Sequence, residues 1–183
     1  MRAARIGIVT ASDRASAGIY RDESGPAIEQ WLTRTLTSRF TLLRRIIPDG
    51  LESVRDTLVD LADNEHCDLI LTTGGTGPSA RDLTPEATEA VAHRHMPGFG
   101  ELMRAQSLKQ VPTAILSRQM AVTRGQCLII NLPGKPGSIA PCLNAIFAAV
   151  PYCLDLMGAA RIEADPAVLV TFRPSETVEK PPV

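Results

Sequence analysis

The sequence lacks three features that would each define a protein class: an excess of charge of one sign, a long apolar run and paired cysteine motifs. Its 183 residues hold 19 Lys and Arg against 20 Asp and Glu, a net charge of −1. This balance excludes a general nucleic-acid binder, which needs a basic surface, although a local basic patch stays compatible. No apolar run approaches the roughly 20 residues that span a bilayer. "RIGIVT" enters a strand pattern near the start of the chain, which leaves no room for a signal peptide. We therefore expect a cytoplasmic protein with no membrane or nucleic-acid partner.

The cysteines are scattered, with no C-x-x-C spacing, and each lies among apolar residues: Cys67, Cys127, Cys142 and Cys153. Cysteines in such company are typically reduced and buried, as in cytoplasmic proteins. The three histidines show no zinc-ligand spacing either. The sequence therefore predicts neither a disulfide framework nor a zinc site.

Alternating strand and helix patterns predict a single α/β domain. Strand patterns occupy residues 5–10, 40–47, 68–73 and 127–132, and the last two lack alternation, as strands buried on both faces should. Helical patterns begin near Pro26 and Leu51 and fill residues 85–94, 98–108 and 139–156, the last interrupted near Pro151. This order predicts a three-layer sandwich around a largely parallel sheet. We expect residues 1–160 to form this domain and 161–183 to form a C-terminal extension that is partly mobile.

Small polar, acidic or glycine-rich loops follow all four predicted strands. Ligands bind at the carboxyl ends of strands in open parallel sheets, so these loops are expected to meet in one site. The residues that they bring to this edge are Ser12, Asp13, Asp49, Gly74, Gly75, Thr76, Gly77, Asp82, Asn131, Pro133 and Gly134.

The loop "TTGGTGPSARD" suits the binding of phosphate oxygens. Glycine permits positive φ and close approach of a ligand, and successive N–H groups in such a turn form an anion nest. No lysine follows the glycines, which excludes a Walker loop. A dinucleotide fingerprint is rejected because the loop follows the third strand and Pro78 is a poor start for a packed helix. The competing interpretation is a strand-to-helix turn with no ligand.

Two aspartates accompany this loop. Asp49 has a structural alternative, because Glu52 three residues later would complete a capping box. A purely structural role is less favoured for Asp82, since Thr84 and Pro85 already supply an N-cap and first turn for the next helix. Carboxylates beside a phosphate nest repel an anion unless a metal lies between them, and Mg²⁺ takes one or two carboxylates plus phosphate oxygens. The combination predicts metal-assisted chemistry on a nucleoside triphosphate.

Several motifs resemble one known family from about residue 6 to residue 156. "SDRAS", "TTGGTG" followed by "RDLTPEAT", "MPGFGELMR", "AILSR" and "NLPG" are similar to those of the molybdopterin adenylyltransferases, the Mog and gephyrin G-domain family. "TTGGTG" also occurs in related domains with other activities, whereas the next three motifs are more specific. The resemblance implies a homotrimer that transfers AMP from ATP to molybdopterin, releases pyrophosphate and passes the product to a molybdenum-insertion partner.

The same resemblance assigns roles to single residues. Asp49 and Asp82 match the family's acidic pair, which is catalytic and holds Mg²⁺ at the triphosphate. The phosphate loop matches residues 74–77, namely Gly74, Gly75, Thr76 and Gly77. Ser107 and Ser117 fall at the pterin end, and other pocket loops match Ser12, Asp13, Asn131, Pro133 and Gly134.

One segment departs from the family pattern. Between Gly134 and Tyr152 the chain is shorter than in many members, and Pro141 is unusual there. This leaves the outer wall of the pocket open to question. Two alternatives also stay open: a molybdopterin-binding carrier or scaffold without ATP chemistry, and a nucleotide pyrophosphatase similar to the competence-damage proteins. The acidic pair argues against the first, and the pterin-side serines argue against the second.

Overall fold

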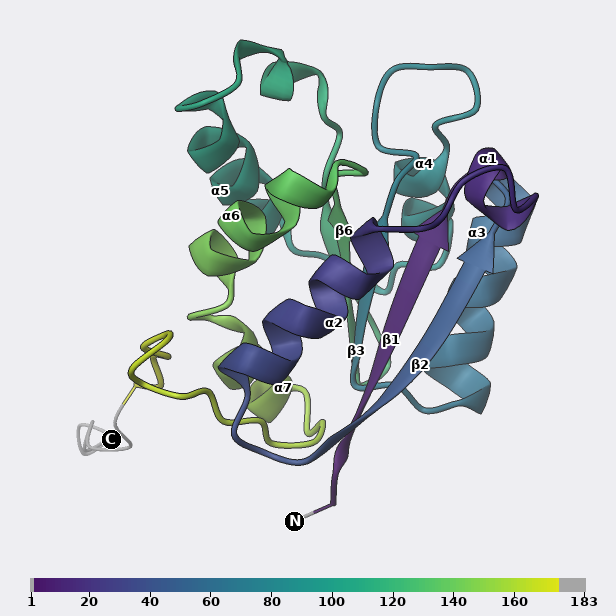
Figure 1. The fold of residues 1–183 in the computed structure, drawn as a ribbon. Coiled ribbons are helices and arrows are strands. Elements are labelled where there is room, and N and C mark those ends of the chain that lie inside the picture. The colour runs from purple at the N-terminus through teal and green to yellow at the C-terminus, as the bar shows by residue number, and fades with distance from the viewer. Residues whose placement is uncertain (1, 175–183) are drawn as a thin grey trace, which may run out of the picture.

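The chain forms a six-stranded sheet covered by helices on both faces (Figure 1). This computed structural model describes residues 2–174. The strand order is β2-β1-β3-β6-β5-β4, and the first four strands are parallel while β5 and β4 run antiparallel to their neighbours. The strands are β1 (Ala4–Ala11), β2 (Phe40–Ile47), β3 (Leu69–Thr73), β4 (Arg94–His95), β5 (Ala121–Arg124) and β6 (Cys127–Leu132).

The helices divide between the two faces of the sheet. Those with side chains in the larger core are α2 (Ser24–Thr35), α5 (Pro97–Leu108), α6 (Pro136–Ile146) and α7 (Val150–Leu156). On the other face lie α3 (Leu51–Val59), which continues as a π-helical turn over Asp60–Asn64, and α4 (Thr84–Ala90). The short α1 (Asp13–Ser16) and a 3-10 turn (Pro112–Leu116) lie in connections. The predicted three-layer α/β sandwich is confirmed.

Alternation along β1 separates the two cores. Ile6 and Ile8 face the core under α2 and α6, whereas Val9 and Ala11 face the core under α3 and α4. Successive strand residues point to opposite faces, so an apolar run without polar alternation fills both layers. This explains why β3 is buried at all five positions.

Helix α2 shows how the sequence fixes one covering element. Ile28, Trp31 and Leu32 recur at helical spacing and are all buried. Asp22 accepts hydrogen bonds from the N–H groups of Ser24 at 3.0 Å and Gly25 at 3.1 Å, which satisfies donors that have no partner inside the helix. This start places Ser24 at the carboxyl edge of the sheet, where its hydroxyl donates to the Gly134 carbonyl at 2.8 Å.

Three sequence predictions need correction. The strand pair β4 and β5 was not predicted, and the helix expected over 85–94 ends at Ala90, so Arg94 belongs to β4. The structural alternative for Asp49, a capping box with Glu52, does not form, because Gly50 is the N-cap of α3 and makes no side-chain cap. Thr84 is likewise no cap: it is the first residue of α4, and its hydroxyl is buried with no partner in the described chain.

The predicted interruption near Pro151 separates α6 from α7, which are bent by 61°. Among the described residues no single helix is long and apolar enough to cross a membrane, and only this bent pair meets that test by length and composition. Each helix contributes fully buried side chains to the core, Ile139 from α6 and Leu154 from α7.

Residues 161–174 pack against the domain. Ile162 is fully buried, and the N–H of Thr37 donates to the Glu163 carbonyl at 2.9 Å. Arg173 pairs with Asp155 at 2.5 Å. The mobility predicted for part of residues 161–183 was expected at the C-terminal end, where residues 175–183 lie outside the described residues.

The four cysteines are free thiols, as expected. Three of them are buried and Cys153 is half-buried. Burial raises the pKa of the Cys67 thiol to about 11 and also raises the pKa of Cys127. These thiols therefore stay protonated near neutral pH, which suits a structural role.

Candidate active site

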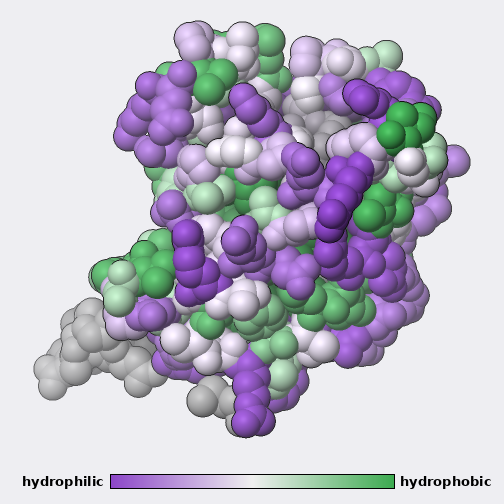
Figure 2. Space-filling view, in the orientation of Figure 1, coloured by the Kyte–Doolittle hydropathy of each residue, from purple (hydrophilic) through white to green (hydrophobic). Residues whose placement is uncertain are grey.

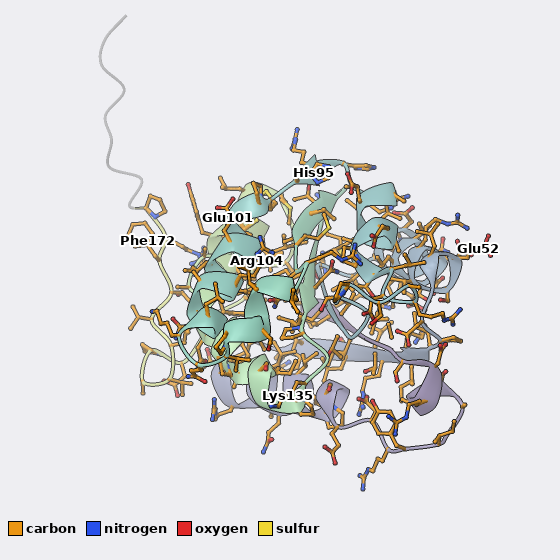
Figure 3. All side chains as sticks on the ribbon, turned by 90° about the horizontal axis from the view of Figure 1, so that it is seen from above. Glu52, His95, Glu101, Arg104, Lys135 and Phe172 are labelled. Carbon is orange, nitrogen blue, oxygen red and sulfur yellow. The ribbon has the colours of Figure 1, made fainter. Side chains whose placement is uncertain are left out.

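A cavity of about 190 Å³ opens where β1, β2, β3 and β6 end, at the edge viewed in Figure 3. We call it the acidic cavity, because Asp49 and Asp82 both line it. The remaining lining residues come from the strand ends and, in the case of Tyr20 and Ser24, from the segment that leads into α2: Thr10, Ala11, Ser12, Tyr20, Ser24, Thr73, Gly74, Gly75 and Gly134. The parallel topology therefore brings together six predicted site residues from four separate loops.

Asp49 is held by reciprocal bonds with Asp13. Its Oδ2 accepts from the Asp13 N–H at 2.9 Å, and the Asp49 N–H donates to Asp13 Oδ1 at 3.1 Å. Arg81 closes this arrangement: its guanidinium pairs with the Asp13 carboxylate at 2.7 Å and donates to the Asp49 carbonyl at 2.8 Å. Asp13 therefore joins the ends of β1 and β2 and lies behind Asp49; it does not line the cavity.

The pKa values of Asp13 and Asp49 are shifted in opposite directions. Arg81 lowers the pKa of Asp13, chiefly through its hydrogen bond. Burial raises the pKa of Asp49, and repulsion from Asp13 and Asp82 adds to this effect, while the Asp13 N–H opposes it. Burial and the two neighbouring carboxylates thus outweigh the Asp13 N–H and the positive charge of Arg81, and a bound cation would favour the charged form of Asp49.

Asp82 enters the acidic cavity from the loop that precedes α4. Its Oδ2 accepts from the Ser79 N–H at 3.1 Å, and no arginine or lysine side chain lines the cavity among the described residues. No cluster of three or more metal-ligating side chains occurs in this part of the chain. The two carboxylates suit Mg²⁺ that completes its shell with water and phosphate oxygens, and they are too few for an all-protein cage.

The glycines of the loop are needed by the fold as well as by any ligand. Gly74 and Gly75 have φ of +94° and +62°, a region that L side chains rarely adopt. A Cβ on Gly74 would clash with the Ala11 carbonyl oxygen, and one on Gly75 would clash with the Thr84 hydroxyl. Both interpretations of the loop, tight turn and ligand approach, thus have a structural basis.

A second, larger cavity of about 280 Å³ adjoins the first, and Gly134 lines both. We call it the outer cavity. Ser107 comes to it from α5 and Ser117 from the end of the 3-10 turn. Its lining residues are Thr76, Gly77, Ser107, Gln110, Val111, Thr113, Ala114, Leu116, Ser117, Gln119, Pro133, Gly134, Lys135, Gly137, Ser138 and Pro141.

The hydroxyl groups of the outer cavity have few protein partners. Ser117 Oγ is buried without a partner in the described chain, so a bond from this side chain to a neighbouring backbone group is not observed. Ser107 Oγ lies 3.6 Å from Cys142 Sγ, a weak partner. Buried polar groups normally find hydrogen bonds, and one without a partner beside a cavity points to a ligand.

Gln119 was missed by the sequence analysis and also faces the outer cavity. Only 2% of the residue is exposed, and its side-chain amide contacts two sulfurs, Met103 Sδ at 3.7 Å and Cys142 Sγ at 3.5 Å. The single signal for it was its place directly after "AILSR". Tyr20 and Lys135 were missed as well, since both lie in loops without periodicity.

Asn131 lies elsewhere than predicted. It is the fifth residue of β6, its side chain is fully buried, and its amide donates to the Thr72 hydroxyl at 3.0 Å and the Thr88 hydroxyl at 2.9 Å. It therefore links β6 to β3 and α4 beneath the site and lines neither cavity. Of the same motif, Pro133 and Gly134 do line the site.

The segment around Pro141 is the part of the pocket wall where the sequence departs from the family pattern. Pro141 lies inside α6 and lines the outer cavity. Lys135, the N-cap of α6, also lines the outer cavity, and in Figure 3 it lies at the lower edge of the molecule, well away from Glu52 of α3 at the right. The shortened segment thus still forms a helix that closes the outer cavity.

A parallel α/β sheet with a glycine turn, two carboxylates and two adjoining cavities at its carboxyl edge defines the class of open-sheet proteins that bind ligands at strand ends. The chain belongs to the family described as "Probable molybdopterin binding domain", which matches residues 7–152. This confirms the family and the fold that the motifs predicted.

Named relatives match along nearly the whole chain. The molybdopterin adenylyltransferase of Escherichia coli K12 is 52% identical over 186 residues, covering 95% of each chain. That of Helicobacter pylori 26695 is 50% identical over 176 residues, covering 96% of this chain and 100% of the relative. Among solved structures, the molybdopterin biosynthesis enzyme MoaB of Thermus thermophilus has a TM-score of 0.78 at 39% identity, covering 86% of this chain and 98% of that one.

Proposed function

We propose that this chain transfers AMP from ATP to molybdopterin, giving adenylylated molybdopterin and pyrophosphate in molybdenum cofactor biosynthesis. One observation carries the proposal: the acidic cavity and the outer cavity meet at Gly134, a residue without a side chain. Two ligands, one in each cavity, are thereby able to bring their phosphates together. The names of the relatives agree with this activity.

The nucleotide belongs in the acidic cavity. The turn at Gly74 and Gly75 presents backbone without Cβ atoms to the triphosphate. Asp49 and Asp82 would hold Mg²⁺ here. The metal would supply positive charge that offsets the charge of the phosphates and polarises the phosphoryl group under attack. The pKa of Asp49 is raised chiefly by burial, so a bound cation would favour the charged form of this carboxyl group.

Molybdopterin belongs in the outer cavity. Ser107 and Ser117 offer hydroxyl groups to the pterin end, and Thr76 and Gly77 lie between these serines and the phosphate turn. The terminal phosphate of molybdopterin would point toward Gly134. One of its oxygens then attacks the α-phosphorus of ATP, a new P–O bond forms, and the bond from the α-phosphorus to the bridging oxygen breaks as pyrophosphate leaves. The protein positions both ligands, which is the main requirement of phosphoryl-type transfer.

The supporting residues hold this arrangement in place. Ser12 caps α1 by accepting from the Ala15 N–H at 3.2 Å. Asp13 fixes Asp49, and the Pro133 carbonyl accepts from the Thr73 hydroxyl at 2.8 Å. We assign these residues to the support of the cavity walls and not to contact with the reacting atoms.

The central test compares Asp82→Asn with a matched control, Glu52→Gln. Glu52 is an exposed carboxylate of α3 that lines neither cavity. Pyrophosphate release from ATP is measured at saturating Mg²⁺, with and without molybdopterin. The rate of pyrophosphate release should fall on the order of 10²- to 10³-fold in Asp82→Asn, as when one preorganised charge-stabilising group is removed. The rate should stay unchanged in Glu52→Gln.

The outcomes separate the competing functions. Release of pyrophosphate that depends on molybdopterin supports adenylyl transfer. Turnover of ATP without molybdopterin would indicate a pyrophosphatase, and binding of molybdopterin with no turnover would indicate a carrier. Wild-type turnover in Asp82→Asn would refute the metal role of the acidic pair.

We further propose that the protein is a cytoplasmic homotrimer that contacts a molybdenum-insertion protein transiently, as the family resemblance implies. Exposed apolar side chains offer a surface for self-association: Val170 is 75% exposed and Phe172 68%. Hydrophobic side chains also gather at the lower left of the face shown in Figure 2. Sedimentation velocity should give three times the mass of 19.7 kDa, and a monomer at micromolar concentration would refute the assembly.

A further inference from the structure

Arg118 holds the loop of residues 77–82 from its inner side. Its Nε donates to the Gly77 carbonyl at 3.0 Å, and its Nη2 donates to the Asp82 carbonyl. Its Nη1 pairs with Glu86 Oε1 in the first turn of α4. A single guanidinium thus joins both ends of the loop to the helix that follows, with geometry that only the planar fork of arginine offers.

Apart from Arg118, the described contacts between this loop and the sheet come from Arg81. Residues 78–81 are exposed. The N–H of Asp82 donates to the Ser79 carbonyl at 2.9 Å and that of Leu83 to the Arg81 carbonyl at 3.0 Å, which are local turns. Arg81 joins the loop to the ends of β1 and β2: it donates to the Asp13 carboxylate at 3.0 Å and 2.7 Å and to the Asp49 carbonyl at 2.8 Å. Arg81 thus ties the exposed part of the loop to the sheet, whereas Arg118 bonds directly to the backbone of Asp82 and of Gly77.

Arg118 also lies between the two cavities. The backbone around it is extended, and its N–H donates to the Thr76 carbonyl at 2.8 Å. Ser117 and Gln119, its neighbours on either side, both line the outer cavity, whereas the Arg118 side chain extends to the loop of the acidic cavity. The segment 117–119 thus contacts both halves of the site.

We propose that Arg118 is a positioning residue that holds the Asp82 carboxylate in the acidic cavity, acting through the backbone carbonyls of Gly77 and Asp82. This rests on the metal role given to Asp82 under the proposed function. A small displacement of a carboxylate that binds Mg²⁺ weakens both metal binding and turnover, since a misplacement of about 1 Å costs as much as 10²-fold in rate.

Arg124 is a matched control for the loss of a guanidinium. It pairs with Asp63 through two bonds of 2.9 Å and 2.5 Å and donates to the Val91 carbonyl at 3.2 Å. It lies at the end of β5 that pairs with Cys127, the first residue of β6, and so at the opposite edge of the sheet. Arg124→Lys therefore removes a comparable set of bonds far from both cavities.

The experiment compares Arg118→Lys and Glu86→Gln with Arg124→Lys. Three quantities are measured for each: kcat of pyrophosphate release, the Mg²⁺ concentration for half-maximal rate, and hydrogen exchange of residues 77–82. In Arg118→Lys, kcat should fall between about tenfold and about 100-fold, the Mg²⁺ requirement should rise several-fold, and exchange of this loop should accelerate. Glu86→Gln should change all three in the same direction by less, while Arg124→Lys should leave them unchanged.

The readouts distinguish this proposal from the one on which it rests. Wild-type kcat and Mg²⁺ dependence in Arg118→Lys, combined with a large loss in Asp82→Asn, would overturn the positioning role and leave the metal role intact. Wild-type turnover in Asp82→Asn would refute the metal role instead, and hydrogen exchange of the loop then decides on Arg118. Unchanged exchange in both Arg118→Lys and Glu86→Gln overturns the proposal. If Arg118→Lys does not fold, Glu86→Gln carries the test.

Discussion

Gly77→Ala is the substitution that tests the acidic pair with the least disturbance of the fold. Unlike Gly74 and Gly75, Gly77 does not have a positive φ. A Cβ at this position would lie 2.8 Å from Asp82 Oδ2, and the next atom is the Asp82 carboxyl carbon at 3.7 Å. The added methyl group therefore pushes on one functional side chain and on nothing else nearby.

The size of the displacement follows from the distances. Ordinary van der Waals contact begins at 3.4 Å, so the carboxylate oxygen must move by the difference from 2.8 Å, 0.6 Å or more. Such a shift at a metal-binding oxygen should lower kcat of adenylyl transfer between about tenfold and about 100-fold. Stability should change little. Alanine restricts the unfolded chain and so stabilises the folded protein by about 0.4–1 kcal/mol. This gain offsets the cost of the close contact with Asp82, which the carboxylate relieves by rotating.

The assay is pyrophosphate release with ATP, Mg²⁺ and molybdopterin, alongside the melting temperature. The melting temperature of Gly77→Ala should stay within about 4 °C of wild type, the shift expected for 1 kcal/mol in a domain of this size. Gly98→Ala is the control, because a Cβ there meets nothing within 4 Å. Wild-type kcat in Gly77→Ala would refute the claim that the position of Asp82 limits the reaction.

Three further predictions address the remaining parts of the site. Gly75→Ala should destabilise the folded protein whether or not the loop binds a ligand. The left-handed conformation costs about 1–2 kcal/mol, and overpacking against Thr84 costs about 1–3 kcal/mol more. An unchanged melting temperature would contradict this. In Asp49→Asn the charge that burial disfavours is gone. The raised pKa of Asp49 means that wild-type stability falls as pH rises from the ordinary value of 3.8 through the raised one. The variant should therefore melt at or above the wild-type temperature at pH 7, lose this advantage toward pH 3.8 and still lack activity; lower stability at pH 7 would oppose the argument. Ser107→Ala and Ser117→Ala should weaken molybdopterin binding by roughly threefold to a little over tenfold, the equivalent of about 0.5–1.5 kcal/mol, and leave binding of a non-hydrolysable ATP analogue unchanged in calorimetry. Equal losses for both ligands would refute separate pterin and nucleotide ends.

The four parallel strands could be predicted because their apolar runs are long enough to identify. Strand β5 has only four residues. Strand β4 has two residues, and both of these residues are exposed. Neither strand is therefore long enough to carry a strand pattern of its own. Their conformation comes from pairing with β6, which is a tertiary effect. The same holds for Arg94, which the helical pattern of 85–94 included wrongly.

The site could be predicted to the extent that topology determines it. Residues at the ends of parallel strands meet, and this brought Asp49 and Asp82 into one cavity. Asn131 was expected to line the pocket, although the predicted strand 127–132 already includes it. This strand is buried on both faces and lacks alternation, so its pattern did not show that the Asn131 side chain points to the face under α4. Arg118 and Gln119 could not be found, because their roles depend on a 3-10 turn and on side chains from distant elements.

The wall shared by the two cavities determines how the transfer proceeds. A covalent relay through the protein would need a nucleophilic side chain between the two ligands. The residue at the junction is Gly134, which lies against Gly74. A Cβ added to Gly134 would lie only 3.2 Å from the Gly74 Cα. Bare backbone on both sides of the junction favours direct passage of the adenylyl group from one substrate to the other. Under the proposed function the reaction is then a single in-line displacement, in which both substrates occupy the protein at once and the configuration at the α-phosphorus is inverted.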